Sequence, residues 1–133
     1  MLQVRLRTIE MNARINEETV NDRAKLIIHR LIARRLAREP ELISVARSRL
    51  AVSDESPDYV REWEALLRLE PLLVQRALIS RSERMARLRL SSPFTSVFDF
   101  QDPAFRKRVW RLARRGVTPR SEDQAPIRHS VSA

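Results

Sequence analysis

Residues 17–38 read EETVNDRAKLIIHRLIARRLAR, and this stretch decides the fold. Its apolar residues recur at helical spacing beside a stripe of arginines, a pattern typical of an amphipathic helix with one buried face. Asn16 stands where an N-cap belongs, and Glu17 and Glu18 place negative charge in the first turn. The sequence therefore predicts a long helix over about 17–38. Its buried face would consist of Val20, Ala24, Ile27, Ile28, Leu31 and Ile32.

Residues 2–8, ahead of this helix, alternate between apolar and polar side chains. Alternation with a period of two predicts one short N-terminal strand. A lone strand needs a mate, and two explanations stay open. Either a second copy of the chain supplies the pairing strand, or Met11 is the true start and residues 1–10 are a leader.

The rest of the chain contains a single glycine, and its breaks fall at Pro, Ser and Asp, which are helix-start signals. Further helices are predicted over 40–50, from Pro57, from Pro71, from a Ser80/Glu83 capping box to Leu90, and from Asp102–Pro103 to Arg115 with Gly116 as the cap. The predicted fold is all-α, an irregular bundle of five to six short helices in one domain, 1–116. Residues 117–133 lack apolar periodicity and are predicted to be a disordered tail.

The formal net charge is +9, and residues 81–115 alone carry 10 basic and 3 acidic residues. Such a block attracts phosphate or an acidic protein surface. Two basic sets are candidates for contacting nucleic acid: Arg81, Arg84 and Arg87, and Lys107, Arg111 and Arg114. Alternatively, these are solvated helix faces whose arginines pair with acids elsewhere, and the preference for arginine over lysine reflects a GC-rich genome.

Catalytic machinery is absent from the sequence. There is no cysteine, and the two histidines, His29 and His129, lie far apart, so neither a thiolate site nor a nitrogen–sulfur metal cluster is expected. His29 is predicted to be a surface imidazole on the polar flank of the first long helix. We therefore predict a protein that is not an enzyme and that binds no cofactor and no metal.

Aromatic residues supply the candidates for protein binding. The predicted partner-binding residues are Trp63, Phe94, Phe98, Phe100 and Trp110. The run PFTSVFDF over 93–100 is an aromatic-rich loop, which either fills the helical core or docks into another protein. Trp63 is likewise either part of a core stripe or part of a partner-binding face.

Several segments together resemble a group of small helical bacterial proteins. The segments are His29-Arg30-Leu31, Pro40-Glu41-Leu42, Tyr59…Trp63…Leu66-Leu67 and Leu88-Arg89-x-Ser91-Ser92-Pro93-Phe94. The proteins that they resemble are the antitoxins of toxin–antitoxin-type gene pairs, and the similarity covers about residues 26–98. The resemblance implies a non-catalytic partner of a separately encoded protein, such as a toxin, with DNA binding as a second role.

No apolar run approaches the roughly 18 residues that a membrane span needs, and the N-terminus lacks the apolar stretch of a signal peptide. We therefore expect a cytoplasmic protein with no membrane contact. The leading hypothesis is a protein-binding module, antitoxin-like or adaptor, that masks a partner protein. The alternative is a basic protein that contacts nucleic-acid phosphates through its Arg-rich helices.

Overall fold

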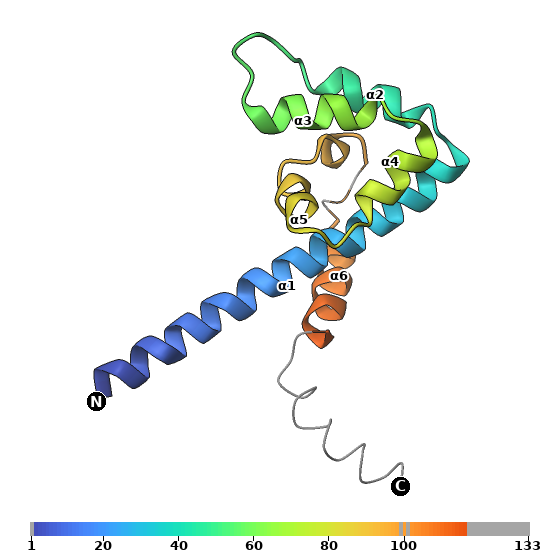
Figure 1. The fold of residues 1–133 in the computed structure, drawn as a ribbon. Helices are drawn as coiled ribbons and strands as arrows, with labels where there is room; N and C mark the ends of the chain where they lie inside the picture. Colours follow the sequence, from blue (N-terminus) through green and yellow to red (C-terminus); the bar gives the residue numbers. More distant parts are fainter. Residues whose placement is uncertain (1, 99, 101, 117–133) are drawn as a thin grey trace, which may run out of the picture.

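Figure 1 shows the fold as a computed structural model, which describes residues 2–98, 100 and 102–116, with side chains from residue 17 onward. This part of the chain is helical and contains no strand, which confirms the predicted all-α fold class. The elements are α1 (Leu2–Arg38), α2 (Leu42–Arg49), α3 (Asp58–Leu67), α4 (Pro71–Leu78), α5 (Glu83–Arg89), the 3-10 helix η1 (Pro93–Ser96) and α6 (Pro103–Arg115). The predicted tail, 117–133, lies outside the described residues.

Helix α1 is 37 residues long and begins at Leu2, so the predicted strand over 2–8 and the predicted cap at Asn16 are both wrong. The physical reason is that residues 2–16 contain neither glycine nor proline, and that nine of these fifteen residues are good helix formers (Leu, Met, Ala, Arg, Gln or Glu). A helix also satisfies its own backbone hydrogen bonds, which a lone strand cannot do. The N-terminal part of α1 extends beyond the other helices (Figure 1).

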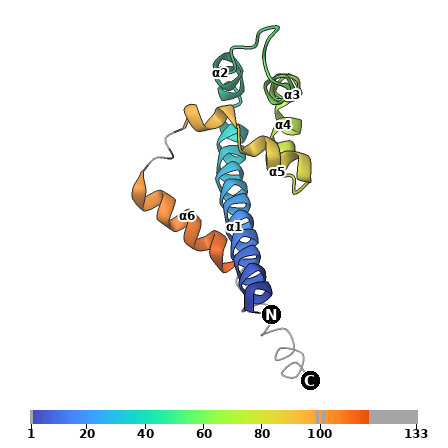
Figure 2. The same ribbon diagram turned by 90° about the vertical axis from the view of Figure 1, so that its left-hand side faces the viewer.

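The C-terminal part of α1 forms the spine of the molecule, because α4, α5 and α6 all pack against it. In Figure 2, α6 lies on one side of α1, whereas α4 and α5 lie on the other side. Helices α2 and α3 pack against each other at the far end of α1, and η1 packs on α2. The fold therefore presents two separate faces, divided by α1.

The core lies between α1 and the shorter helices. Its largest fully buried side chains are Trp63, Phe94, Ile32, Leu36, Leu78, His29 and Val74. The Trp63 and Phe94 rings meet edge to face with their centroids 6.3 Å apart, a favoured aromatic geometry. The indole Nε1 of Trp63 donates a hydrogen bond of 3.0 Å to the Leu88 carbonyl, which joins α3 to α5.

Most helix starts follow the predicted signals. Pro71 occupies the first turn of α4, and the Asp102 side chain caps α6 by accepting from the Phe105 amide at 3.1 Å. The predicted capping box at Ser80 is wrong, because the hydroxyl of Ser82 accepts from the Met85 amide and starts α5 two residues later. The Ser80 hydroxyl instead donates to Ser82, 3.2 Å away.

Candidate interaction surfaces

Two of the predicted partner-binding residues lie inside the protein. Trp63 and Phe94 both have 0% of their surface exposed. A partner cannot touch either side chain in this fold, so their assignment to a contact surface is corrected: both are core residues. Of the two roles that the sequence left open for the 93–100 segment, its first half fills the core.

Phe98 and Phe100 continue the aromatic packing outward. Phe98 lies 6.4 Å from Phe94, Phe100 lies 5.8 Å from Phe98, and Phe105 stacks on Phe100 at 5.4 Å between ring centroids. This row of rings connects the core to the start of α6. Both Phe98 and Phe100 are half-buried, so their rings serve chiefly to attach α6 to the rest of the fold.

A groove of about 460 Å³ lies between α1 and α4. It is lined by Arg30, Ala33, Arg34, Ala37, Leu72, Gln75, Arg76 and Ile79. The alanines of α1 form a shallow apolar floor, since their side chains end at Cβ. Beside it stand Leu72 and Ile79, 54% and 43% exposed, on residues 69–79, which include α4 and which we call the α4 segment. Ligand-binding grooves commonly combine such an apolar lining with a few polar groups.

The apolar character continues past the groove on the outer side of the α4 segment. Leu69 is 47% exposed and Leu73 is 43% exposed. Exposed single leucines are ordinary on protein surfaces, but here four large apolar side chains within eleven residues are exposed. The sequence carried a signal for this exposure, because residues 69–79 contain more large apolar residues than one short helix can bury.

The rim of the groove is positively charged. Arg30, Arg34 and Arg76 are all exposed. Within the part of the chain that the structure describes, the ion pairs join Arg35 to Glu39, Arg47 and Arg68 to Glu64, and Arg84 to Glu62. The three rim arginines take part in none of these, so their charges face solvent with no carboxylate partner among the described residues.

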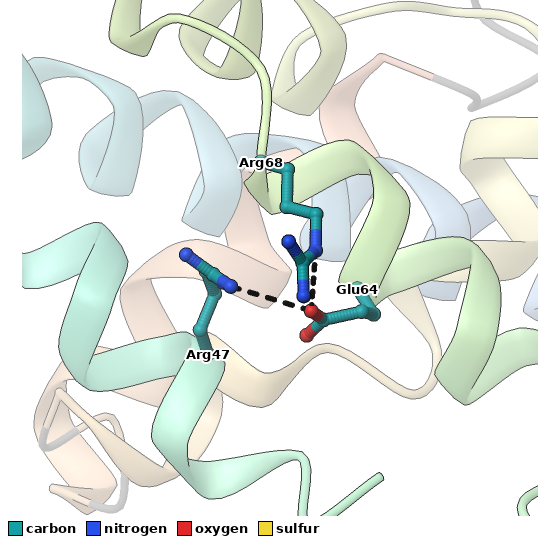
Figure 3. Close-up of polar contacts among 3 residues, drawn as sticks. All are labelled: Arg47, Glu64 and Arg68. Carbon is teal, nitrogen blue, oxygen red and sulfur yellow. Dashed lines mark hydrogen bonds and ion pairs between the residues drawn. The ribbon is translucent and has the colours of Figure 1, made fainter.

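Figure 3 shows two arginines that, unlike those of the groove rim, share a carboxylate. Arg68 and Arg47, from the end of α3 and from α2, both reach the Glu64 carboxylate, at 2.6 and 3.3 Å. Desolvation raises the pKa of Glu64, but the hydrogen bonds and positive charges of Arg68 and Arg47 outweigh it and hold that pKa below its ordinary value. These arginines therefore serve the fold, in contrast to those of the groove.

The basic set near α5 is less available to phosphate than the sequence suggested. Arg81, Arg84 and Arg87 are exposed, but Arg81 precedes the helix, so the three do not form one helical ridge. Arg84 lies 3.8 Å from Glu62. Arg87 lines a depression together with Glu18, Asp22 and Glu83, whose carboxylates repel phosphate. Use of this set as a phosphate-binding ridge is thus disfavoured.

The basic set on α6 has the opposite character. Lys107, Arg111 and Arg114 are exposed, and none of them forms an ion pair within the described residues. Trp110, a predicted partner-binding residue, is half-buried, and the Arg106 guanidinium covers its ring at 4.7 Å. The buried stripe of α6 is Val109 and Ala113. Leu112 lies outside this stripe and is 50% exposed.

His29 is not the surface imidazole that the sequence suggested. It is 0% exposed, and its Nδ1 lies 2.7 Å from the Lys25 carbonyl, so Nδ1 carries the proton and donates. Its Nε2 has no hydrogen-bond partner in the part of the chain that the structure describes. Burial, together with the nearby charges of Arg89 and Lys25, lowers the pKa of His29 to about 4, although its hydrogen bond to Lys25 opposes the shift.

Arg89 lies close to His29 and is also buried. One guanidinium nitrogen donates to the carbonyls of Leu78 and Ser80, at 3.1 and 2.7 Å, which fastens α5 to the end of α4. Burial is the main cause that lowers its pKa. Arg89 is therefore part of the protein interior.

Comparison of the chain with protein families, with curated proteins and with solved structures found no match. Among the described residues, no helix combines the length and the apolar character that crossing a bilayer requires. The described residues also contain no group of three or more histidines and carboxylates placed to hold a metal ion. The candidate site is an apolar groove with a cationic rim.

Proposed function

We propose that this protein is a non-catalytic binding module that masks a separately encoded partner protein, in the manner of an antitoxin or an adaptor. The partner contributes an amphipathic helix with acidic flanks, which lies in the groove between α1 and α4. The observation that carries the proposal is the combination, in one groove, of exposed Leu72 and Ile79 with three exposed arginines, Arg30, Arg34 and Arg76, that form no ion pair among the described residues.

The dimensions of the groove suit a helix. Leu72 and Ile79 are seven residues apart, which is about 10 Å at the helical rise and two turns of a partner helix. Recognition of a helix in a groove uses apolar anchors at this spacing. Arg30 and Arg34 are one turn apart on α1, about 6 Å along the axis, so carboxylates one turn apart on the partner can meet both guanidinium groups.

Charge complementarity selects an acidic partner over a second copy of this chain. The chain has a net charge of +9, so two copies repel each other, and a rim of three free guanidinium groups favours carboxylates. Burial of Leu72 and Ile79 supplies most of the binding free energy, whereas the rim arginines orient the partner and raise the association rate.

Affinity capture from the source cells, after nuclease treatment, tests the proposal. We expect the unaltered protein to retain one stoichiometric acidic partner, and the Leu72→Ser/Ile79→Ser variant to lose it. Leu112→Ser is the matched control, because Leu112 is an equally exposed leucine on α6. Equal capture by all three proteins, or no stoichiometric partner for any of them, would contradict the proposed function.

A further inference from the structure

Helix α6 contains six basic residues and no acidic residue, the most one-sided charge of any helix in the described structure. Its 13 residues span about 20 Å. Val109 and Ala113 face α1 and are buried, whereas Lys107, Arg111 and Arg114 follow each other at helical spacing on the opposite face. We call these three residues the α6 stripe.

We propose that the α6 stripe binds the phosphate backbone of double-stranded nucleic acid while the α1–α4 groove holds its protein partner. The stripe extends for about 10 Å, which is comparable to the width of a DNA major groove. Phosphate contacts of this kind fix position and carry no sequence information, so the binding is independent of sequence.

The surroundings of α6 favour an anion over any other ligand. The positive charge of α6 reaches α1, where burial and the charge of Arg106 lower the pKa of Lys25. On the other side of α1, by contrast, Arg87 stands among three carboxylates. Of the two basic sets, only the α6 stripe therefore presents positive charge that nothing in the described structure neutralises.

Two observations separate duplex nucleic acid from other polyanions. A membrane-surface helix needs a free apolar face, but the apolar stripe of α6 is buried against the spine. Binding of single strands uses open aromatic rings for base stacking. Trp110, however, is half-buried and its ring is covered by Arg106. What α6 offers is a row of guanidinium and ammonium groups on a rigid helix, which fits a double-stranded backbone.

The position of α6 makes this surface independent of the groove. Helices α6 and α4 lie on opposite sides of α1 (Figure 2), so a duplex on α6 and a protein helix in the groove do not compete for space. Duplex binding by α6 therefore does not depend on whether the groove binds a protein partner.

The test is fluorescence anisotropy with a labelled 24-base-pair duplex of arbitrary sequence, titrated between 50 and 200 mM salt. Each phosphate contact contributes about −0.9 to the slope of log affinity against log salt, so the α6 stripe contributes about −2.7. Over this fourfold change in salt, the stripe alone accounts for a loss of affinity of about 40-fold. The Lys107→Gln/Arg111→Gln/Arg114→Gln variant should lose that part of the slope and bind at least tenfold more weakly at 50 mM.

The control is Arg30→Gln/Arg34→Gln/Arg76→Gln, which removes the same charge from the other side of α1 and should keep the slope. Circular dichroism of both variants checks that each is folded. Equal weakening by the two variants would mean that only overall charge matters, and would overturn the proposal. Absence of duplex binding would overturn it too, whether or not the protein binds vesicles of anionic phospholipid in a parallel titration.

Discussion

The aromatic segment 93–100 and the outer side of the α4 segment both carry several large apolar side chains, and the fold turns them in opposite directions. The aromatic segment points inward: Phe94 is fully buried, and Phe98 continues the row of rings toward α6. The α4 segment points outward, with Leu72 and Ile79 exposed beside a groove. Apolar content alone therefore does not identify a binding surface.

What distinguishes the two regions is whether the chain supplies its own partner. Phe94 meets Trp63 edge to face, and the row of rings ends on Phe105 of α6. On α4, buried Val74 and Leu78 already fill the contact with the core. The large apolar side chains on the other side, such as Leu72, therefore have no packing partner in the described structure. Replacing an inward residue such as Phe94 should therefore lower the stability of the fold, whereas replacing an outward residue such as Leu72 should weaken binding of a partner.

The largest effect should come from the inward region. Phe94→Ala removes a fully buried ring, and such truncations cost about 3 to 5 kcal/mol of unfolding free energy. Urea denaturation followed by circular dichroism measures this loss. Phe94→Leu, which keeps much of the volume, should cost clearly less. A loss below about 1 kcal/mol for the alanine variant would mean that the aromatic segment is not part of the core.

The next largest effect concerns pH and buried His29. Its pKa of about 4 is lower than the ordinary 6.5, so between these pH values the unfolded chain binds a proton that the folded protein does not. Stability from this group is complete above about pH 6.5 and declines as the pH falls to about 4. The loss is about 3 kcal/mol in total.

His29→Gln isolates this contribution, because glutamine does not titrate and carboxylates titrate equally in both proteins. The unfolding free energy of the unaltered protein minus that of the variant, measured from pH 7.5 to 4.5, should decrease steadily as the pH falls. A difference that stays constant over this range would show that the imidazole is not buried in its neutral form.

A smaller effect is expected at the paired surface of α2 and α3. Glu64→Gln removes the carboxylate that Arg47 and Arg68 share. Since the Arg68 side chain is 65% exposed, solvent screens the interaction, and the cost should be no more than about 1 kcal/mol. Thermal denaturation at low and high salt checks it, and the cost should fall as salt rises. A cost that is larger and independent of salt would place Glu64 in the protein interior.

The smallest effect on stability should come from the outward region. Leu72→Ser and Ile79→Ser change exposed side chains, and each should alter the free energy of unfolding by no more than about 0.5 kcal/mol. The same urea titration as for Phe94 measures this change. A cost of 2 kcal/mol or more for either would show that these side chains support the fold, and would remove the contrast between the two regions.

The local elements of the fold were largely predictable from the sequence. Pro71 and Asp102 correctly predicted the starts of α4 and α6. The fixed φ of the proline and the capping carboxylate of the aspartate both act within one helical turn, so these signals can be recognised in the local sequence. The first turns of α1 were not predicted, since the alternating residues 2–8 resemble a strand until the absence of a pairing partner is considered. The boundary at Ser82 was missed because two serines two residues apart offer the same cap.

The candidate site was much less predictable. Whether Phe94 or Leu72 is buried depends on contacts between segments far apart in the chain, such as Phe94 with Trp63. Helical periodicity shows that a helix has an apolar face, but it does not show which of two faces is covered. His29 illustrates the same limit, because its burial depends on α5, some sixty residues away, which brings the charge of Arg89 near it.

Site-specific photo-crosslinking tests the central claim most directly, with a benzophenone amino acid placed at position 72 in one protein and at position 112 in another. After irradiation in the source cells, the account predicts that position 72 captures one protein, through a peptide with apolar residues at helical spacing and flanking Asp or Glu. Position 112, on α6, should not capture that protein. The same protein captured equally from both positions, or a basic peptide captured at position 72, would contradict the account.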